Sequence, residues 1–288
     1  MAAVAPRFAR VAIVGVGLIG GSLAIDCRAN GSWGRIVGIG RSQGNLDVAL
    51  ERGLIDEASR DPAAAAGCDL VILATPVASL VAMARRLAPY LSAGCLVIDV
   101  GSVKGTLAEE IQAVLPAGVH FVGSHPIAGS ERAGAAAARP GLFVDAHCIV
   151  VPPAGADPAA VDRVEALWRS VGGRVIFMDG ADHDGLFAAV SHLPHVVAYA
   201  LATTVLARDG ERRRGFAGAG FRDTTRIARS SPEMWRDICL LNRKAVLQEI
   251  DYFQTRLAAM RTALRAGDGD ALLAAFTAAR DAIEGSHG

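Results

Sequence analysis

A histidine stands in the glycine-flanked segment GSHPIAGSE, residues 123–131, which directly follows the apolar run HFV. A turn that only joins two elements needs no histidine, whereas an imidazole with an unperturbed pKa near neutrality transfers protons there. A lone histidine at a strand end is more often structural. At the C-terminal edge of a parallel α/β sheet, however, it is well placed for catalysis. We therefore take His125 as a candidate general base.

A second polar segment, DVGSVKG at residues 99–105, also follows an apolar run. If the two runs are neighbouring parallel strands, Ser102 and His125 lie at the same sheet edge and can hydrogen-bond. The competing role for Ser102 is a helix N-cap. Lys104 is one of only two lysines in the chain, and either a surface position or a role at this edge is open to it.

The segment GVGLIG, residues 15–20, follows the first apolar run and opens a helical stretch. In that setting the glycine spacing predicts a dinucleotide site, although a glycine-rich turn without a ligand is the alternative. Gly15 permits the tight turn, and Gly20 lets helix and strand pack closely. Gly17 lets backbone N–H groups approach a pyrophosphate at the helix N-terminus. The cofactor-binding residues expected here are Gly15, Gly17, Leu18, Ile19 and Gly20.

The end of the second apolar run indicates which nicotinamide cofactor is used. NAD-binding proteins usually carry Asp or Glu there for the ribose hydroxyls, but this run ends in Gly40, Arg41 and Ser42. A guanidinium and a hydroxyl suit a 2′-phosphate, so we expect NADP. NAD stays open if Arg41 only stacks on the adenine or lies in solvent. Thr75, at the end of the third run, either lines the cofactor site or simply ends its strand.

Two later segments carry histidine and arginine. In SHLPH, Ser191 and His195 are four residues apart and share a helix face, while Pro194 predicts a kink. The segment FRDTTRIARSSPEMWRDI presents either an ordinary charged helix face or an anion clamp, because a guanidinium binds a carboxylate through two hydrogen bonds. The arginines in question are Arg222, Arg226 and Arg229.

Apolar strand-like runs alternate with helical stretches over about the first 180 residues, the pattern of a doubly wound α/β sheet. The expected strands are 11–15, 35–40, 69–75, 96–100, 120–124, 147–152 and 174–179. Two of the expected helices are 107–115 and 157–172. We therefore expect an N-terminal Rossmann-type dinucleotide-binding domain over residues 1–180.

After Asp179 the strand-like runs end and long helical patterns take over. The expected helical stretches are 181–208, 233–266 and 268–284, with a polar, glycine-rich break at 208–226. These patterns predict a C-terminal all-helical domain over residues 181–288.

The composition excludes several classes of protein. The 29 basic and 29 acidic residues give zero net charge, so no global field draws the chain to nucleic acid or to a membrane. Five scattered cysteines without a CxxC argue against a disulfide framework and a metal site, and they fit a cytoplasmic protein. The apolar run 185–207 approaches spanning length, but its Ser, His and Pro residues are costly in lipid. We expect a buried helix there.

Together these segments resemble the prephenate/arogenate dehydrogenase family of tyrosine biosynthesis. The resemblance runs from about Val11 to about Phe253, and it rests on GVGLIGGSLA, DVGSVKG, GSHPIAGSE, SHLPH and FRDTTRIARSSPEMWRDI. Relatives with the same two-domain architecture share only the first of these segments. The resemblance implies oxidative decarboxylation of prephenate or L-arogenate, to 4-hydroxyphenylpyruvate or L-tyrosine, with hydride transfer to NAD(P).

The resemblance also implies roles for single residues and an assembly. His125 takes the proton of the substrate's C4 hydroxyl, Ser102 helps to position it, and Arg226 binds a carboxylate. The substrate-binding residues that it implies are Ser130, Glu131, Ser191, His195, Asp223, Arg226 and Trp235. Aromatisation drives the decarboxylation, so no metal is required. The partners implied are a small-molecule substrate and a second copy of the chain, in a homodimer formed through the helical domain.

Two departures from the family pattern leave choices open. Ser130 stands where many members carry Thr, which bears on the substrate, and Gly40 stands where many carry an acid, which bears on the cofactor. Two rival functions stay open as well. A two-domain imine or pyrroline-carboxylate reductase would not need SHPIAG together with SHLPH. A non-catalytic nucleotide-sensing protein would bind NADP(H) without turning over a cyclohexadienol.

Overall fold

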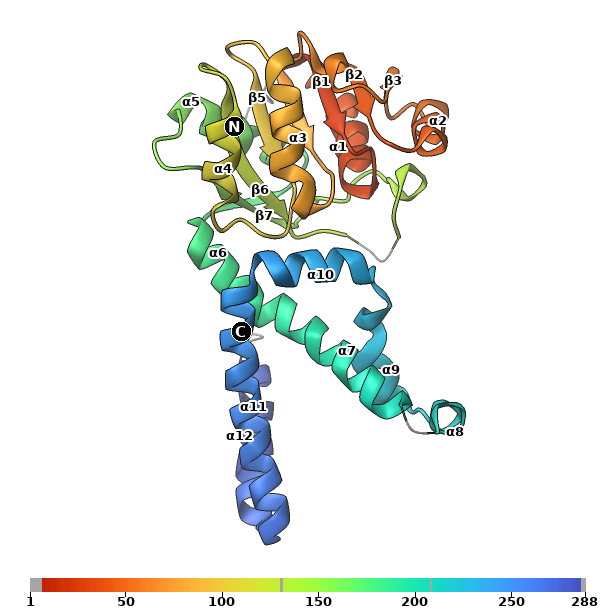
Figure 1. Cartoon of the computed structure of the whole chain (residues 1–288), viewed down its shortest axis with the longest axis vertical. Helices are drawn as coiled ribbons and strands as arrows, with labels where there is room; N and C mark the ends of the chain where they lie inside the picture. Colours follow the sequence, from red (N-terminus) through yellow and green to blue (C-terminus); the bar gives the residue numbers. More distant parts are fainter. Residues whose placement is uncertain (1–6, 130–131, 208, 286–288) are drawn as a thin grey trace.

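The computed structural model describes residues 7–129, 132–207 and 209–285. Its N-terminal part contains an eight-stranded sheet with the order β3-β2-β1-β4-β5-β6-β7-β8 (Figure 1). Neighbouring strands are parallel except β6 and β7, which are antiparallel. The strands are β1 (Phe8–Val14), β2 (Trp33–Ile39), β3 (Glu57–Ser59), β4 (Leu70–Leu73), β5 (Leu96–Asp99), β6 (His120–Pro126), β7 (His147–Val151) and β8 (Arg174–Phe177).

Helices cover both faces of this sheet, which is why its central strands are apolar throughout. Alternate residues of β1 point to opposite sides: Val11 and Ile13 join one apolar cluster, Ala12 and Val14 the other. The first cluster contains side chains of α1, α2 and α5, and the second contains those of α3 and α4. These helices are α1 (Leu18–Ala29), α2 (Gln43–Glu51), α3 (Leu80–Leu87), α4 (Leu107–Val114) and α5 (Pro158–Ser170).

The C-terminal part is helical. Figure 1 shows α11 and α12 as a long hairpin that extends away from the sheet, with α10 lying between the sheet and α7. The elements are α6 (Gly180–Phe187), the π-helical turn η5 (Ala188–His192), α7 (Leu193–Leu206), α8 (Gly210–Gly215), α9 (Ala219–Thr225), the 3₁₀ turn η6 (Arg226–Arg229), α10 (Pro232–Leu241), α11 (Arg243–Ala266) and α12 (Gly269–Gly285). The architecture confirms the predicted Rossmann-type sheet followed by a helical domain.

Three local predictions were wrong in detail. The edge strand β3 was missed, because its three residues, EAS, are too short and polar to stand out. The break at 208–226 contains two short helices, α8 and α9. The expected helix over 233–266 is divided at Asn242, whose side chain is buried and hydrogen-bonds other helices.

The helical stretch Gly180–Leu206 is long and apolar enough to span a membrane. An 18-residue segment of it has a mean hydropathy of 1.4, but only 22% of that segment is buried within the chain. The expectation of a buried helix was therefore wrong for a single chain. Its first turns contain His183 and Asp184, which are buried against the sheet domain and are costly to place in lipid. Length and composition alone are weak evidence for a membrane span.

Candidate active site

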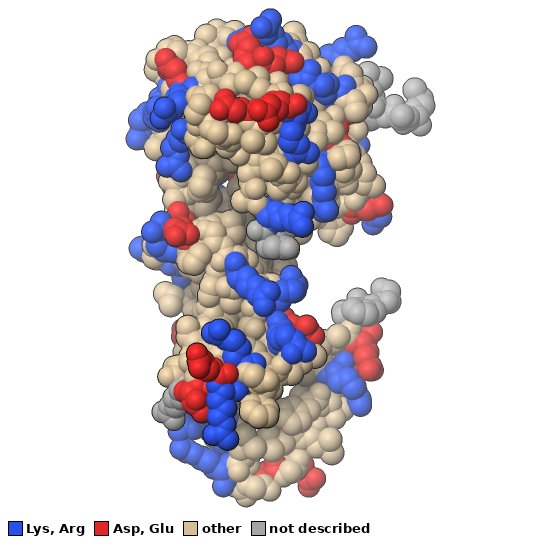
Figure 2. Space-filling view, turned by 90° about the vertical axis from the view of Figure 1, so that its right-hand side faces the viewer, with Lys and Arg blue, Asp and Glu red and all other residues tan. Residues whose placement is uncertain are grey.

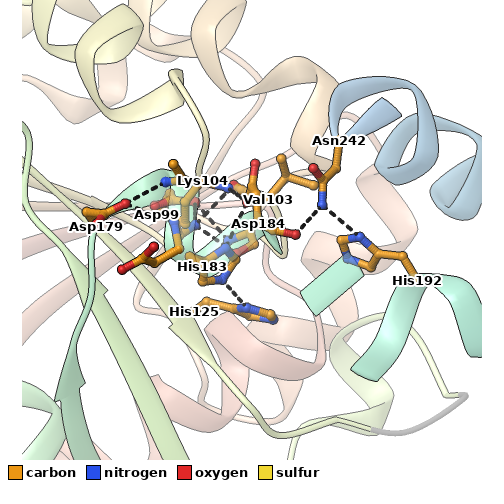
Figure 3. Close-up of polar contacts among 12 residues, drawn as sticks. Asp99, Val103, Lys104, His125, Asp179, His183, Asp184, His192 and Asn242 are labelled. Carbon is orange, nitrogen blue, oxygen red and sulfur yellow. Dashed lines mark hydrogen bonds and ion pairs between the residues drawn. The ribbon is translucent and has the colours of Figure 1, made fainter. Parts of the chain in front are cut away.

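His125 is the second-last residue of β6, beyond the point where its pairing with β5 ends but still paired with Ile149 of β7. Its Nδ1 lies 2.9 Å from Nε2 of His183, which comes from α6 (Figure 3). Nδ1 of His183 in turn lies 2.8 Å from Oδ1 of Asp184. Two imidazoles and a carboxylate therefore form a hydrogen-bonded chain between the sheet and the helical domain.

A buried ion pair anchors the loop 100–106, which contains Lys104 and lies next to these three hydrogen-bonded side chains. Nζ of Lys104 lies 2.6 Å from Oδ2 of Asp99, and both side chains are almost fully buried. The ammonium also donates to the Gly101 carbonyl, while the backbone N–H of Ser124 donates to the other Asp99 oxygen. The backbone N–H of Lys104 donates to Asp184 at 2.8 Å. This loop therefore connects the ends of β5 and β6 to the carboxylate of α6.

His192 and Asn242 extend the polar network deeper into the helical domain. The Asn242 side-chain amide donates to the Asp184 carbonyl at 2.7 Å and lies 3.1 Å from Nδ1 of His192. The joint between α10 and α11 is thereby fixed to α6 and η5, as Figure 3 shows. Because Asn242 satisfies these buried groups, the three helices hold a fixed position relative to one another.

Burial keeps the site histidines neutral at physiological pH. The pKa of His125 lies well below its usual value, first because of burial and then because of the positive charge of Lys104. The pKa of His183 is lowered by burial, against the opposing effect of its hydrogen bond to Asp184. Burial lowers the pKa of His192 to about 4. At pH 7, therefore, His125 has an unprotonated nitrogen that can accept a proton.

His195 lies on α7, farther along the helical domain than His183 and His192. Its Nδ1 lies 2.9 Å from the backbone carbonyl of Ser191, and its ring stacks on Trp235 with centroids 3.5 Å apart. The pKa of His195 is lowered by burial, and the positive charge of Arg226 lowers it further. Arg226 is exposed and begins η6 directly after α9, which carries the exposed Asp223. The structure thus brings Ser191, His195, Arg226 and Trp235 together.

Positive charge marks this side of the molecule. The segment α9–η6, with its exposed arginines, lies on the side of the chain that Figure 2 faces. Lys and Arg side chains gather across the middle of that face, below the sheet domain. This distribution favours an anionic ligand near the junction of the two domains.

The glycine loop after β1 has the geometry that a dinucleotide requires. Gly15 has a φ of +93°, and a Cβ there would lie 2.6 Å from the Ala74 carbonyl oxygen. A Cβ on Gly20 would lie 2.7 Å from the Ile13 side chain, so this glycine allows α1 to pack against β1. At Gly17 a Cβ would meet nothing within 4 Å, and no side chain caps the N-terminus of α1. The first-turn N–H groups, those of Leu18 and Ile19 among them, thus face open space suited to a phosphate.

The residues expected at the ribose and nicotinamide ends lie at the same sheet edge. Arg41 is exposed just beyond β2. Ser42 has a structural role as well, because its hydroxyl caps α2 by accepting from the Asn45 N–H at 3.3 Å. Thr75 follows β4 and accepts a hydrogen bond from Ser79 at 2.9 Å. Arg41 is therefore the side chain at this position that is free of a capping role.

Comparisons with known proteins decide the family. The profile described as prephenate dehydrogenase, nucleotide-binding domain, matches residues 23–177, and that described as prephenate dehydrogenase, dimerization domain, matches residues 179–278. This chain belongs to the prephenate dehydrogenase family. Among curated relatives, the prephenate dehydrogenase of Bacillus subtilis is 36% identical over 96% of this chain and 75% of its own. The cyclohexadienyl dehydrogenase of Zymomonas mobilis is 36% identical over 93% of each chain.

Solved structures of the prephenate dehydrogenase family have the same fold. The prephenate dehydrogenase of Aquifex aeolicus, in complex with hydroxyphenyl propionate and NAD+, superposes with a TM-score of 0.88 at 35% identity, covering 96% of this chain and 97% of its own. The arogenate dehydrogenase of Synechocystis superposes with a TM-score of 0.78 at 31% identity, covering 95% and 99%.

For this member of the prephenate dehydrogenase family, sequence reasoning missed His183 and Asp184. The expected hydrogen bond between Ser102 and His125 does not occur among the described residues, where Nδ1 of His125 bonds His183 instead. Lys104, for which a surface position was open, is buried. Ser130 and Glu131 lie outside the described residues. The adjacent His and Asp at the start of the helical domain were the one available signal for the missed pair.

Proposed function

We propose that this chain catalyses the oxidative decarboxylation of prephenate or L-arogenate, with hydride transfer to NAD(P), as a cytoplasmic enzyme of tyrosine biosynthesis. The observation that carries the proposal is a neutral His125 between a dinucleotide loop and an arginine-bearing helical domain. Membership of the prephenate dehydrogenase family supports it.

His125 acts as the general base in this proposal. Its nitrogen takes the proton of the C4 hydroxyl while the C4 hydrogen leaves with its electron pair, which favours a carbonyl at C4. The bound nicotinamide supplies the hydride acceptor. The bond from the ring to its carboxylate then breaks, and its electrons make the ring aromatic as CO₂ leaves. The phenolate oxygen recovers the proton from His125, so the reaction releases no net proton.

Arg226 binds a carboxylate of the substrate in this proposal. Its guanidinium is exposed, and its charge is felt by His195, which stacks on Trp235. The backbone carbonyl of Ser191 holds His195 beside it. We propose that Ser102, Ser130, Glu131 and Asp223 also bind the substrate or position His125, on the strength of their motifs alone.

We further propose NADP as the preferred cofactor. The second strand ends without an acid to bind the ribose hydroxyls, and Arg41 is exposed there to pair with a 2′-phosphate. The Aquifex aeolicus relative was crystallised with NAD+, so the two cofactors have to be compared directly. Gly15, Gly17 and Gly20, with the N–H groups of Leu18 and Ile19, would hold the pyrophosphate, and Thr75 would border the nicotinamide side.

We also propose a homodimer formed through the helical hairpin. Six large Leu, Ile or Phe side chains on the described part of α11 and α12 are more than half exposed within one chain: Leu247, Leu257, Leu264, Leu273, Phe276 and Ile283. A hairpin this apolar and this exposed favours association with a second apolar surface. The matching family profile is described as a dimerization domain. Light scattering on the purified chain tests this, with twice the 29.8 kDa chain mass expected.

Steady-state turnover tests the proposed reaction. We expect NAD(P)H to form from prephenate, L-arogenate or both, and CO₂ to form in equal amount. The kcat/KM values for both substrates with both cofactors then give the substrate and cofactor preferences. A purified chain that binds NADP(H) but turns over neither substrate would favour the nucleotide-sensing alternative instead.

A further inference from the structure

The geometry points to His183 as a positioning residue for His125, with Asp184 setting its protonation state. We propose that this pair fixes His125 as the tautomer whose Nε2 is unprotonated, and that it stabilises the imidazolium formed when His125 takes a proton. The inference rests on the proposed function, because it assigns roles around the same base. It concerns two residues that none of the recognised sequence motifs contains.

The tautomers of His125 and His183 follow from the Asp184 carboxylate, which ends the hydrogen-bonded series. A carboxylate only accepts hydrogen bonds, so Nδ1 of His183, 2.8 Å from Asp184, carries a proton. His183 is neutral because burial lowers its pKa, so its Nε2 is an acceptor. Nδ1 of His125, 2.9 Å away, must then be the donor. Neutral His125 is left with a lone pair on Nε2, the nitrogen that makes no hydrogen bond within the described residues.

Asp184 is held in place from two directions. Its Oδ1 accepts the Lys104 N–H, and its backbone carbonyl accepts the Asn242 side chain. A Cβ added at Gly105 would lie 2.8 Å from its other oxygen, so this glycine leaves room for the carboxylate. The Lys104 ammonium is already paired with Asp99. Among the described residues, Asp184 therefore has no Lys or Arg side chain bound to it and can stabilise charge that arrives through His183.

The same hydrogen-bonded series can accommodate the positive charge that His125 gains when it takes a proton from the substrate. When Nε2 of His125 gains the substrate proton, its Nδ1–H becomes a stronger donor to His183. A shift of that proton to Nε2 of His183 would place the imidazolium directly against the Asp184 carboxylate. Both steps reverse when the phenolate recovers its proton, so no proton is gained or lost. This arrangement stabilises the protonated base through His183 and Asp184, which are buried where an isolated cation is costly.

Other charged groups face the two imidazoles and must be kept constant in any test. Lys104 and His192 act on His125, and Lys104 with its partner Asp99 acts on His183. Phe187 lies on the same helix and contacts both rings, with centroids 4.7 Å from His125 and 4.5 Å from His183, but it has no polar atom. It provides a matched packing control.

The first test compares His183→Phe with His183→Gln in the full chain. Phenylalanine removes the acceptor from Nδ1 of His125, so we expect kcat for prephenate or L-arogenate to fall about 10²-fold, within the range of general-base catalysis. Glutamine keeps an acceptor for His125 and a donor for Asp184, so it should restore part of the loss. A glutamine variant no better than phenylalanine, or a phenylalanine variant within three-fold of wild type, would overturn the positioning role.

The second test removes the charge and keeps the hydrogen bonds. In Asp184→Asn the amide oxygen still accepts from His183 and Lys104. With the negative charge gone, the His125 imidazolium is less stable, so the pKa of His125 falls and the acid limb of the kcat–pH profile moves to lower pH. Phe187→Leu should change melting temperature and leave that limb in place. An unmoved limb in Asp184→Asn would contradict the charge role.

A third readout does not depend on turnover. The ¹⁵N chemical shifts of the His125 ring report which nitrogen carries the proton, and we expect Nδ1 protonated and Nε2 unprotonated at pH 7. In His183→Phe this preference should be lost. If wild type turns over neither substrate, the proposed function fails while the tautomer assignment is still decided by these shifts. If wild type is active but Nε2 of His125 is protonated, the inference alone fails.

Discussion

The imidazole of His195 lies flat against the indole of Trp235, with the ring planes inclined by only 20°. Trp235 is on α10 and joins the apolar cluster that contains α3 and α4 of the sheet domain. His195 is on α7. The stack therefore connects α7 and α10 to the apolar cluster of the sheet domain, near Arg226, which begins η6.

Replacing Trp235 by alanine or by phenylalanine should show that the packing of its ring, and not its indole N–H, stabilises the fold. Trp235→Ala should lower the free energy of unfolding by about 3–5 kcal/mol, the usual loss for a buried aromatic. The indole Nε1 is buried without a hydrogen-bond partner among the described residues. Trp235→Phe should therefore cost much less stability while keeping the stack. Denaturant unfolding of both variants checks this, and equal losses for the two would contradict it.

Arg226 should act mainly on substrate affinity. A charge-assisted pair with a carboxylate contributes about 1.5–3 kcal/mol, so Arg226→Ala should raise KM about ten- to hundred-fold. Arg226→Lys should rescue only partly, because an ammonium lacks the bidentate fork. Arg229, exposed at the other end of the same 3₁₀ turn, is the matched control. An unchanged KM in Arg226→Ala for both prephenate and L-arogenate would refute the carboxylate role.

Substitution of Arg41 should change cofactor affinity, whereas substitution of Ser42 should change stability. Arg41→Ala should weaken NADP binding much more than NAD binding, since only NADP has the 2′-phosphate. Ser42→Ala removes the N-cap of α2 and should cost about 0.5–2 kcal/mol of stability. Cofactor dissociation constants and unfolding curves on both variants decide this. Equal weakening of the two cofactors by Arg41→Ala, or a wild type that prefers NAD, would remove the NADP assignment.

Lys104 should be essential for stability. Breaking a buried ion pair by removing one partner costs about 3–5 kcal/mol, because the other charge is left uncompensated. Lys104→Met should therefore destabilise the chain strongly, while Lys244→Met, on the exposed side of α11, should not. Adding Asp99→Asn to Lys104→Met should recover part of the loss. Unfolding free energies of the four proteins test this, and a loss below about 1 kcal/mol for Lys104→Met would show that the pair is not structural.

The glycine loop and the sheet could be predicted because their signals are local. Gly15, Gly17 and Gly20 follow one apolar run and precede one helix, and their spacing alone fixes which of them turns, which approaches a ligand and which packs. His125 could be predicted for the same reason, since it stands at the end of a strand that the apolar run HFV indicates. The sequence also predicted that the C-terminal part, residues 181–288, is helical.

The contacts of His125 could not be predicted from local pattern. Its partner His183 is 58 residues away and belongs to the other domain. The burial of Lys104 depends on Asp99 and on Gly123, where a Cβ would lie 3.3 Å from the lysine side chain. Asn242 ends a helix through contacts with α6 and η5 that helical periodicity does not reveal. Each of these features depends on contacts between residues that are far apart in the sequence or on different elements, and the contact of His125 also crosses between the two domains.

The central claim is that His125 is the base of a dehydrogenase, and turnover of His125→Asn tests it most directly. With prephenate and with L-arogenate at saturating cofactor, we expect kcat to fall about 10²–10⁴-fold. The dissociation constant for NADP(H) should stay unchanged, because the glycine loop follows a different strand. A variant that retains kcat within a few-fold of wild type for the preferred substrate would contradict the account.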